Sequence, residues 1–204
     1  LIIGAGAVGL GIGSCLAKST DWPITFLTRP GGADSLRDTG INRFGIFGDH
    51  RAAAERYGVI EAIDAAPPGQ FDLILVCTKT FDSEPVAEQL AAHKSILGPD
   101  SKIVLFHNGW GTADIFAARF PRKKIFNARV ITGFRRPDRS SVEITVHADD
   151  IRIGSIYYPE SSPQLATLAQ AISTGGIPAQ ISGNVSRDLW AKLLYNCALN
   201  PLGA

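Results

Sequence analysis

The chain has 204 residues and carries 20 Lys and Arg against 19 Asp and Glu, a formal net charge of +1. This balance excludes the broad basic surface with which proteins hold nucleic acid or an anionic membrane. Hydrophobic residues make up 45% of the chain and charged residues 19%, which are the proportions of a folded globular protein. The length allows one large domain, or one domain and part of another.

Apolar strands alternate with helices through most of the chain. The pattern predicts strands at Leu1–Ile3, Ile24–Leu27, Leu73–Cys77, Ile103–Phe106 and Ile125–Val130. It predicts helices at Val8–Lys18, Glu84–His93 and Thr112–Arg119. Strands that are apolar throughout and separated by helices are typical of a parallel sheet covered on both faces. We therefore expect an α/β fold with a Rossmann-type, doubly wound, mainly parallel sheet.

The remaining segments are expected to be additions to this basic fold. Between Ile41 and Ala65 the pattern is irregular and β-like, and Val142–Val146 with Ile151–Ile153 has the pattern of an antiparallel hairpin. The last elements are expected to be a helix, a short strand and a long helix, at Ser161–Ser173, Ala179–Ile181 and Val185–Leu199.

The three cysteines, Cys15, Cys77 and Cys197, lie far apart within apolar stretches. This usage is typical of reduced thiols buried as small hydrophobic residues, and it implies neither a disulfide framework nor a zinc site. The apolar opening Leu1–Ala17 lacks the basic leader of a signal peptide, and no apolar run approaches the roughly 20 residues needed to span a bilayer. We expect a cytoplasmic protein without bound metal. Because the chain has no Met and opens inside an apolar strand, we also expect the natural chain to begin earlier.

A glycine-rich turn follows the first predicted strand. The segment Gly4-Ala5-Gly6-Ala7-Val8-Gly9 matches the pattern G-x-G-x-x-G and leads into the first helix. Gly4 permits the sharp turn, Gly6 lets the backbone approach a pyrophosphate, and Gly9 brings helix and strand together. The free N–H groups and the positive dipole end of the helix then face the phosphates. A purely structural turn is the alternative, but the strand–turn–helix context favours a dinucleotide site.

Arg29 stands at the end of the second predicted strand, about 20 residues beyond the glycine turn. Enzymes that prefer NAD place an acidic residue there, which binds the ribose 2′-hydroxyl. A guanidinium suits a 2′-phosphate, because its planar fork offers paired donors and a permanent positive charge. The sequence therefore favours NADP over NAD, with a solvated loop arginine as the alternative.

A polar stripe runs along the last predicted helix. Lys192, Asn196 and Asn200 recur at intervals of four, so they lie along one helix face. A lysine with two amides suits an anionic, oxygen-rich substrate. A solvated face is the alternative, although such faces usually mix Glu and Lys. Apolar contacts on the other faces are expected from Leu189, Leu193, Leu194 and Cys197.

Together these motifs resemble the family of 2-dehydropantoate 2-reductases, also called ketopantoate reductases. The resemblance covers essentially the whole chain, and the lysine and two asparagines before Pro201 are far more specific than the glycine turn. It rests on the glycine turn, Arg29, Val76-Cys77-Thr78-Lys79, His107-Asn108-Gly109, Leu189-Trp190-Ala191-Lys192, Asn196-Cys197 and Asn200-Pro201-Leu202.

The resemblance implies reduction of the 2-oxo group of ketopantoate to pantoate with NADPH, on the route to pantothenate and coenzyme A. It implies that Lys192 is the general acid and that Asn196 and Asn200 hold the substrate. Asn108 is implied to position both substrate and nicotinamide, and Lys79 to face the cofactor. An ammonium within hydrogen-bond reach of the reacting oxygen can stabilise and then protonate it, and desolvation of the lysine eases that transfer by lowering its pKa.

Members of the family continue into a helical second domain that adds substrate contacts, whereas this chain ends at Ala204. We therefore assign residues 1–182 to the NADP-binding domain and residues 183–204 to the first helix of a truncated helical domain for substrate binding and dimerisation. The expected partners are a small 2-oxo acid and a second copy of the chain, with neither nucleic acid nor membrane. Two alternatives stay open: a reductase of this family that acts on another 2-oxo acid, and a non-catalytic NADP-binding sensor module.

Overall fold

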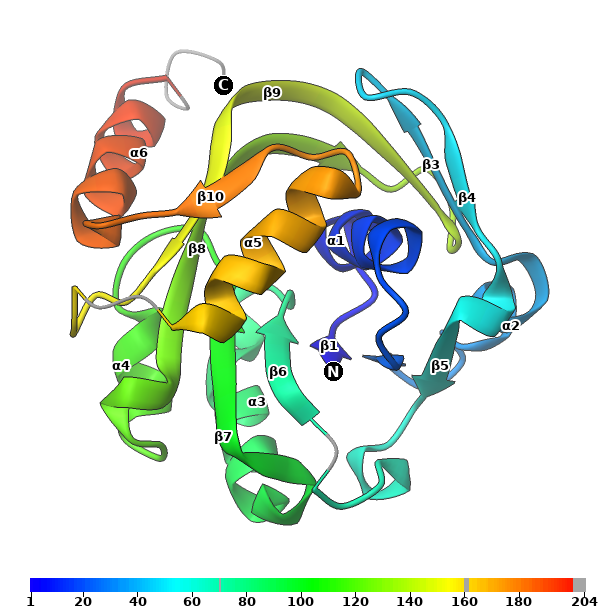
Figure 1. The fold of residues 1–204 in the computed structure, drawn as a ribbon, viewed down its shortest axis with the longest axis horizontal. Coiled ribbons are helices and arrows are strands. Elements are labelled where there is room, and N and C mark those ends of the chain that lie inside the picture. The colour runs from blue at the N-terminus through cyan, green and yellow to red at the C-terminus, as the bar shows by residue number, and fades with distance from the viewer. Residues whose placement is uncertain (70, 160–161, 200–204) are drawn as a thin grey trace.

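The computed structural model describes residues 1–69, 71–159 and 162–199. Its strands are β1 (Ile2–Ile3), β2 (Ile24–Leu27), β3 (Ile41–Gly45), β4 (His50–Ala52), β5 (Tyr57–Ile60), β6 (Phe71–Val76), β7 (Leu97–Leu105), β8 (Ile125–Arg135), β9 (Ser141–Gly154) and β10 (Ala179–Ile181). Its α-helices are α1 (Ala7–Ser19), α2 (Asp34–Thr39), α3 (Ser83–Ala92), α4 (Thr112–Ala117), α5 (Pro163–Thr174) and α6 (Val185–Leu199). The strands form one mixed sheet in the order β4-β3-β9-β8-β7-β6-β1-β2-β5, with β10 beside β9 (Figure 1).

The centre of the sheet is parallel. Its strands follow the order β5-β2-β1-β6-β7-β8, and every neighbouring pair among them is parallel. The chain first builds outward from β1 through β2, and it later resumes on the other side of β1 with β6. This reversal between β1 and β6 confirms the doubly wound Rossmann-type fold. In such folds ligands bind outside the carboxyl ends of the strands, at the point of reversal.

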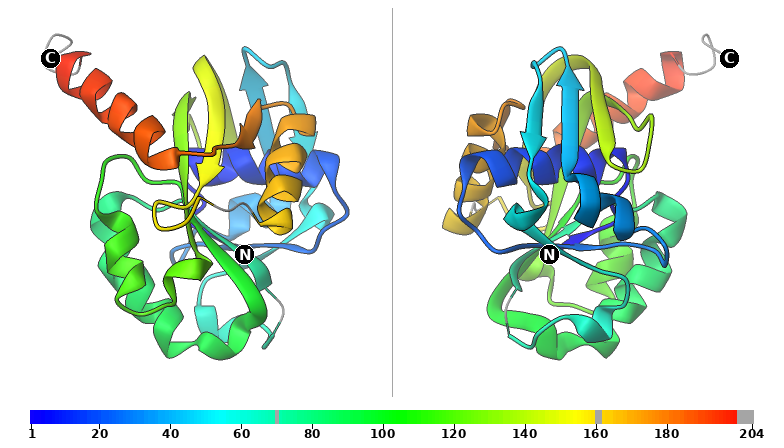
Figure 2. Two further views of the ribbon diagram at one scale, coloured as in Figure 1. Left: turned by 60° about the vertical axis from the view of Figure 1, so that its left-hand side comes forward. Right: turned by 90° about the vertical axis from the view of Figure 1, so that its right-hand side faces the viewer.

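Helices cover both faces of this sheet. α1 and α5 pack together on one face, while α3 and α4 pack on the other (Figures 1 and 2). In β7, Val104 joins the core under α1 and α5, whereas Ile103 and Leu105 join the core under α3 and α4. Successive side chains of a strand point to opposite faces, so burial on both faces explains the continuous apolar runs in the sequence.

The predicted hairpin between Val142–Val146 and Ile151–Ile153 is wrong. Both segments belong to the continuous strand β9, which pairs antiparallel with β8. The hairpin instead joins β8 to β9 through residues 136–140. There the Asp138 carboxylate accepts backbone N–H bonds from the two following serines, at 2.9 and 2.8 Å, and this closes the turn.

The segment between the two predicted hairpin strands contains two consecutive aspartates, Asp149 and Asp150, a residue type that is common in turns. In the structure both stay within β9, and their carboxylates find partners on neighbouring strands. Asp149 pairs with Arg129 of β8 at 2.6 Å, and Asp150 accepts a hydrogen bond from Gln180 of β10 at 2.7 Å. The aspartates are therefore satisfied across the sheet, and the strand does not break.

The segment between Ile41 and Ala65 is only partly an addition to the fold, which corrects a second prediction. Its strands β3 and β4 do extend the sheet beyond β9. The third strand, β5, is the outer strand of the parallel core and pairs with β2. Only two of its four residues, Tyr57 and Val59, are buried, so its sequence lacks the continuous apolar run of a central strand.

The last helix, α6, projects outward from the sheet domain (Figure 2). Its first turns are anchored by the buried Val185 and Leu189. Farther along, Leu194 is 66% exposed and Cys197 is exposed, so these two side chains are not buried against the described residues as the predicted apolar contacts would require. Burial of Cys15 and Cys77 is as predicted. No helix in the described part of the chain is long and apolar enough to cross a membrane.

Candidate active site

The glycine turn lies directly beyond β1, at the reversal of strand order. Gly4 has a φ of +99°, a conformation that favours glycine, and its N–H donates to the carbonyl of Leu27 at 2.9 Å. A Cβ on Gly9 would lie 2.0 Å from the carbonyl oxygen of Gly4, so turn and helix touch there. A Cβ on Gly6, the N-cap residue of α1, would meet no other atom within 4 Å.

These contacts fit a dinucleotide phosphate. The turn is closed at Gly9, where helix and strand must approach, and open at Gly6, where a pyrophosphate must approach. The N-cap residue of α1 is Gly6, which has no side chain to cap the helix, and this leaves the first N–H groups to an anion. The other residues of the turn, Ala5, Ala7 and Val8, are partly buried against the core.

Arg29 lies just beyond β2, at the same edge of the sheet. Its side chain is 80% exposed, and its Nη2 is 3.0 Å from Oδ2 of Asp82. Asp82 ends a short 3-10 turn after β6, and the exposed Lys79 immediately precedes that turn. Exposed ion pairs contribute little energy, so the guanidinium of Arg29 stays accessible to a ligand phosphate. Sequence reasoning missed Asp82, because no spacing rule connects it to Arg29.

A buried histidine lies behind the ends of β6 and β7. Thr78 Oγ1 and His107 Nε2 are 3.4 Å apart. Burial lowers the pKa of His107 to about 4, so the imidazole is neutral near pH 7. His107 therefore supports the loop that carries Asn108 without adding a charge to this edge.

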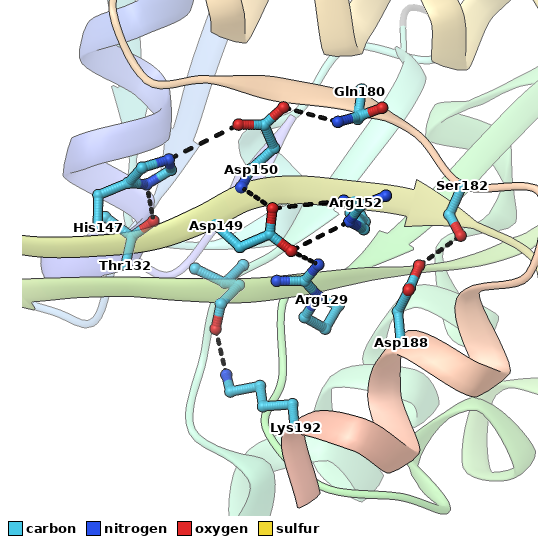
Figure 3. A network of polar contacts seen from close by, with 11 residues as sticks. Arg129, Thr132, His147, Asp149, Asp150, Arg152, Gln180, Ser182, Asp188 and Lys192 are labelled. Atoms are coloured by element: carbon cyan, nitrogen blue, oxygen red, sulfur yellow. Dashed lines mark hydrogen bonds and ion pairs between the residues drawn. The ribbon is translucent and has the colours of Figure 1, made fainter. Parts of the chain in front are cut away.

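Lys192 reaches back from α6 to the sheet domain. Its ammonium donates hydrogen bonds to Oδ1 of Asn108 and to the backbone carbonyl of Val130. Figure 3 shows the lysine pointing at β8 from the neighbouring helix. Burial, and then the charge of Arg129, lower the pKa of Lys192 from 10.5 to about 8. This is the direction expected for a proton-donating lysine.

The ladder between β7 and β8 explains how Val130 comes to meet the lysine. β7 pairs with β8 only as far as Asn127, whereas β8 continues to Arg135. Val130 lies beyond the last pair, at a shift of register between β8 and β9. Lys192 and Asn108 contact β8 where β7 no longer accompanies it, so the lysine site forms at the carboxyl ends of the parallel strands.

The predicted site residues are thus partly brought together. The glycine turn, Arg29, Lys79, Asn108 and Lys192 all lie at the carboxyl edge of the parallel strands. Asn196 is partly buried one turn farther along α6, and Asn200 lies outside the described residues. Sequence reasoning missed the Val130 carbonyl, which no side-chain pattern could indicate. It also missed Arg129, although a charge inside an apolar strand was a usable signal.

In residues 1–69, 71–159 and 162–199, no group of three or more His, Cys, Asp and Glu side chains is arranged to hold a metal ion.

Fold and site together define a Rossmann-type oxidoreductase: a glycine turn at the reversal of a parallel sheet, with a lysine ammonium at the same edge. A family model described as ketopantoate reductase PanE/ApbA matches residues 1–157. The chain therefore belongs to the ketopantoate reductase family, whose members are NAD(P)-dependent oxidoreductases.

Individual proteins show the same relationship. A 2-dehydropantoate 2-reductase of Aquifex aeolicus is 29% identical over the whole of this chain, which spans 62% of the length of that relative. The crystal structure of 2-dehydropantoate 2-reductase from Methylococcus capsulatus has a TM-score of 0.80 and 26% identity, covering 98% of this chain and 62% of that one. D-mandelate dehydrogenase, solved with NADH and anilino(oxo)acetate, shares the fold at 18% identity and a TM-score of 0.75, covering 96% and 61%.

Proposed function

We propose that the protein catalyses the NADPH-dependent reduction of 2-dehydropantoate (ketopantoate) to pantoate, with Lys192 as proton donor. The observation that carries this proposal is the partly buried ammonium of Lys192, held by Asn108 and Val130 at the edge that also carries the glycine turn. Membership of the ketopantoate reductase family supports it. By this route the protein would contribute to pantothenate synthesis.

In this proposal the glycine turn and Arg29 hold the coenzyme. The open space at Gly6 accommodates the pyrophosphate, and the exposed guanidinium of Arg29 binds the 2′-phosphate that distinguishes NADP from NAD. Lys79 lies on the same side and adds a second positive charge. Asn108, in the loop that follows β7, would position the nicotinamide. When bound, the coenzyme supplies a hydride to the 2-oxo carbon of the substrate.

Lys192 supplies the proton. Two of its three N–H groups are directed at Asn108 and Val130, which leaves the third for the 2-oxo oxygen of the substrate. As negative charge grows on that oxygen, the ammonium stabilises it and then transfers a proton. With a pKa of about 8 the lysine is mostly protonated at pH 7, and it gives up its proton more readily than a solvated lysine does.

The remaining substrate contacts are assigned by the same reasoning. Asn196 and Asn200 follow Lys192 at intervals of four on the sequence, and we assign them to hold the substrate. Residues 1–182 form the coenzyme domain in this proposal, and residues 183–204 begin a helical domain that completes the substrate site and pairs with a second copy.

The test is the oxidation of NADPH by the full-length gene product with 2-dehydropantoate and, separately, with other branched 2-oxo acids. We expect kcat/KM for 2-dehydropantoate to exceed that for the others by about tenfold or more. Preference for another 2-oxo acid would overturn the substrate and leave the reductase chemistry in place. Coenzyme binding without reduction of any 2-oxo acid would favour a sensor module.

A further inference from the structure

A guanidinium is buried in β8, immediately before the residue that binds Lys192. The Arg129 side chain is 3% exposed, and its Nη2 is 2.6 Å from Oδ2 of Asp149 on β9 (Figure 3). Its Nε and Nη1 are buried and have no hydrogen-bond partner among the described residues. Burying a partly satisfied guanidinium costs free energy, so its presence among the buried residues of β8 requires an explanation.

Arg129 and Lys192 lie on the same side of the sheet. Val130 packs in the core under α1 and α5, so the alternation of a strand turns its neighbour Arg129 to the opposite face. α6 packs against β8, and Lys192 reaches the Val130 carbonyl from that helix. The guanidinium and the ammonium are therefore neighbouring cations, joined through one peptide unit of β8.

We propose that Arg129, held by Asp149, is a positioning residue for Lys192: it anchors β8 at Val130 and keeps a second positive charge beside the ammonium. This inference rests on the proposed role of Lys192 as proton donor. Arg129 supplies the anchor, because its ion pair ties β8 to β9 at the shift of register that contains Val130. It also supplies the charge, because a neighbouring cation favours loss of a proton from the lysine.

The negative charge of Asp149 has the opposite effect on the titration of Lys192. Hydrogen bonds from Arg152 and Arg129 lower the pKa of Asp149 to about 2, so it is ionised at every pH at which Lys192 titrates. Its negative charge offsets part of the positive charge of Arg129. Removing the arginine and neutralising the aspartate should therefore move the titration of Lys192 in opposite directions, which a purely structural ion pair would not do.

Other charged or titratable groups on the elements around Lys192 have roles of their own. Arg152 shares Asp149 with Arg129, its Nε lying 3.3 Å from Oδ2. Asp188, on α6, accepts a hydrogen bond from the Ser182 hydroxyl at 2.5 Å. The remaining such groups are Arg135 on β8, Glu143, His147 and Asp150 on β9, Arg187, Tyr195 and Cys197 on α6, and His107 beside Asn108.

The experiment measures the titration midpoint of Lys192 by NMR of lysine side chains in the full 204-residue chain, with the signal assigned by its loss in Lys192→Ala. In Arg129→Met we expect the midpoint to rise by on the order of one pH unit. Arg129→Lys keeps the charge and should restore most of the original midpoint. Asp149→Asn should lower the midpoint. Arg152→Gln is the matched control, because it removes a cation from the same carboxylate without touching the residue beside Val130, and it should shift the midpoint much less than Arg129→Met.

An unchanged midpoint in folded Arg129→Met, or equal shifts in Arg129→Met and Arg152→Gln, would overturn the proposal. If Arg129→Met does not fold, Asp149→Asn decides by sign, and a rise in its midpoint would overturn the proposal. The readout does not depend on turnover. A shift as expected in a protein that reduces no 2-oxo acid would contradict the proposed function alone. Reduction that depends on Lys192, without the shift, would contradict this inference alone.

Discussion

The two ends of the candidate site are built in different ways. The glycine turn is local: β1, the turn and the start of α1 lie within Ile2–Gly9, and its tightest approach joins Gly9 to Gly4. The lysine site is assembled from distant parts of the chain, because Lys192 contacts Asn108 and Val130, which are 84 and 62 residues away in sequence. The glycine turn therefore depends mainly on neighbouring residues, whereas the lysine site exists only when α6 docks on β8.

The largest effect should come from removing the lysine. Lys192→Ala is expected to lower kcat by about 10²–10⁴-fold, the usual contribution of a positioned general acid. The dissociation constant for NADPH should stay the same, because the glycine turn does not contact Lys192. Steady-state rates and calorimetric titration measure the two quantities, and the exposed Lys123, before β8, provides a control in Lys123→Ala. A Lys192→Ala variant that keeps its rate would contradict the role of the lysine. A variant that loses both its rate and its affinity for NADPH would show that the lysine site and the glycine turn are not independent.

The next effect concerns the glycine turn. In Gly9→Ala the new methyl group would meet the carbonyl oxygen of Gly4, so we expect a loss of about 1–3 kcal/mol in the free energy of unfolding. Gly6→Ala is the matched variant, because its methyl group meets nothing within 4 Å and should leave stability nearly unchanged. It should nevertheless weaken NADPH binding, since it narrows the approach of the pyrophosphate. Chemical denaturation and titration separate the two results. Equal stability of both variants would contradict the close contact at Gly9.

Replacing Arg29 should change coenzyme preference. Arg29→Gln removes a charge-assisted hydrogen bond to the 2′-phosphate, so the dissociation constant for NADPH should rise by about 10–100-fold. Affinity for NADH should change little, because NADH lacks that phosphate. Arg122→Gln, at the opposite edge of the sheet before β8, is the control. A parallel loss of affinity for both coenzymes would show that Arg29 supports the fold rather than reading the phosphate.

The last expected effect is on acid stability. The folded state lowers the pKa of His107 from 6.5 to about 4, so between these values the unfolded chain binds more protons. The stability contributed by neutral His107 is therefore present above pH 6.5 and lost as pH falls toward 4, by about 2 kcal/mol. Denaturation curves of the protein and of His107→Gln across this window should differ in slope, with the variant flatter. Identical slopes would show that His107 does not titrate in a buried state.

Three elements were predictable from the sequence to the residue, and others to within a few residues. The bounds of Ile24–Leu27, Ala179–Ile181 and Val185–Leu199 agree with β2, β10 and α6. The glycine turn was also predictable, because its steric requirements lie within a few neighbouring residues. Each of these predictions depends on propensity, periodicity or turn chemistry, which a short window of sequence contains.

Features that depend on distant partners were not predictable in this way. β9 continues through Asp149 because Arg129, on another strand, satisfies the carboxylate. Cys197 is exposed because only the first part of α6 packs on the sheet domain. The sequence periodicity of α6 does not indicate where that packing ends. The meeting of Lys192 with Asn108 could not be derived from spacing, and the two were singled out together only through the family resemblance.

Calorimetric titration of NADPH and NADH, in parallel, against the 204-residue chain tests the proposed coenzyme site. We predict that NADPH binds with one site per chain and at least about tenfold more tightly than NADH, because the glycine turn and Arg29 bind a phosphorylated dinucleotide. Equal affinity for the two coenzymes would contradict the role of Arg29. Binding of neither coenzyme would contradict the role of the glycine turn, on which the proposed reduction depends.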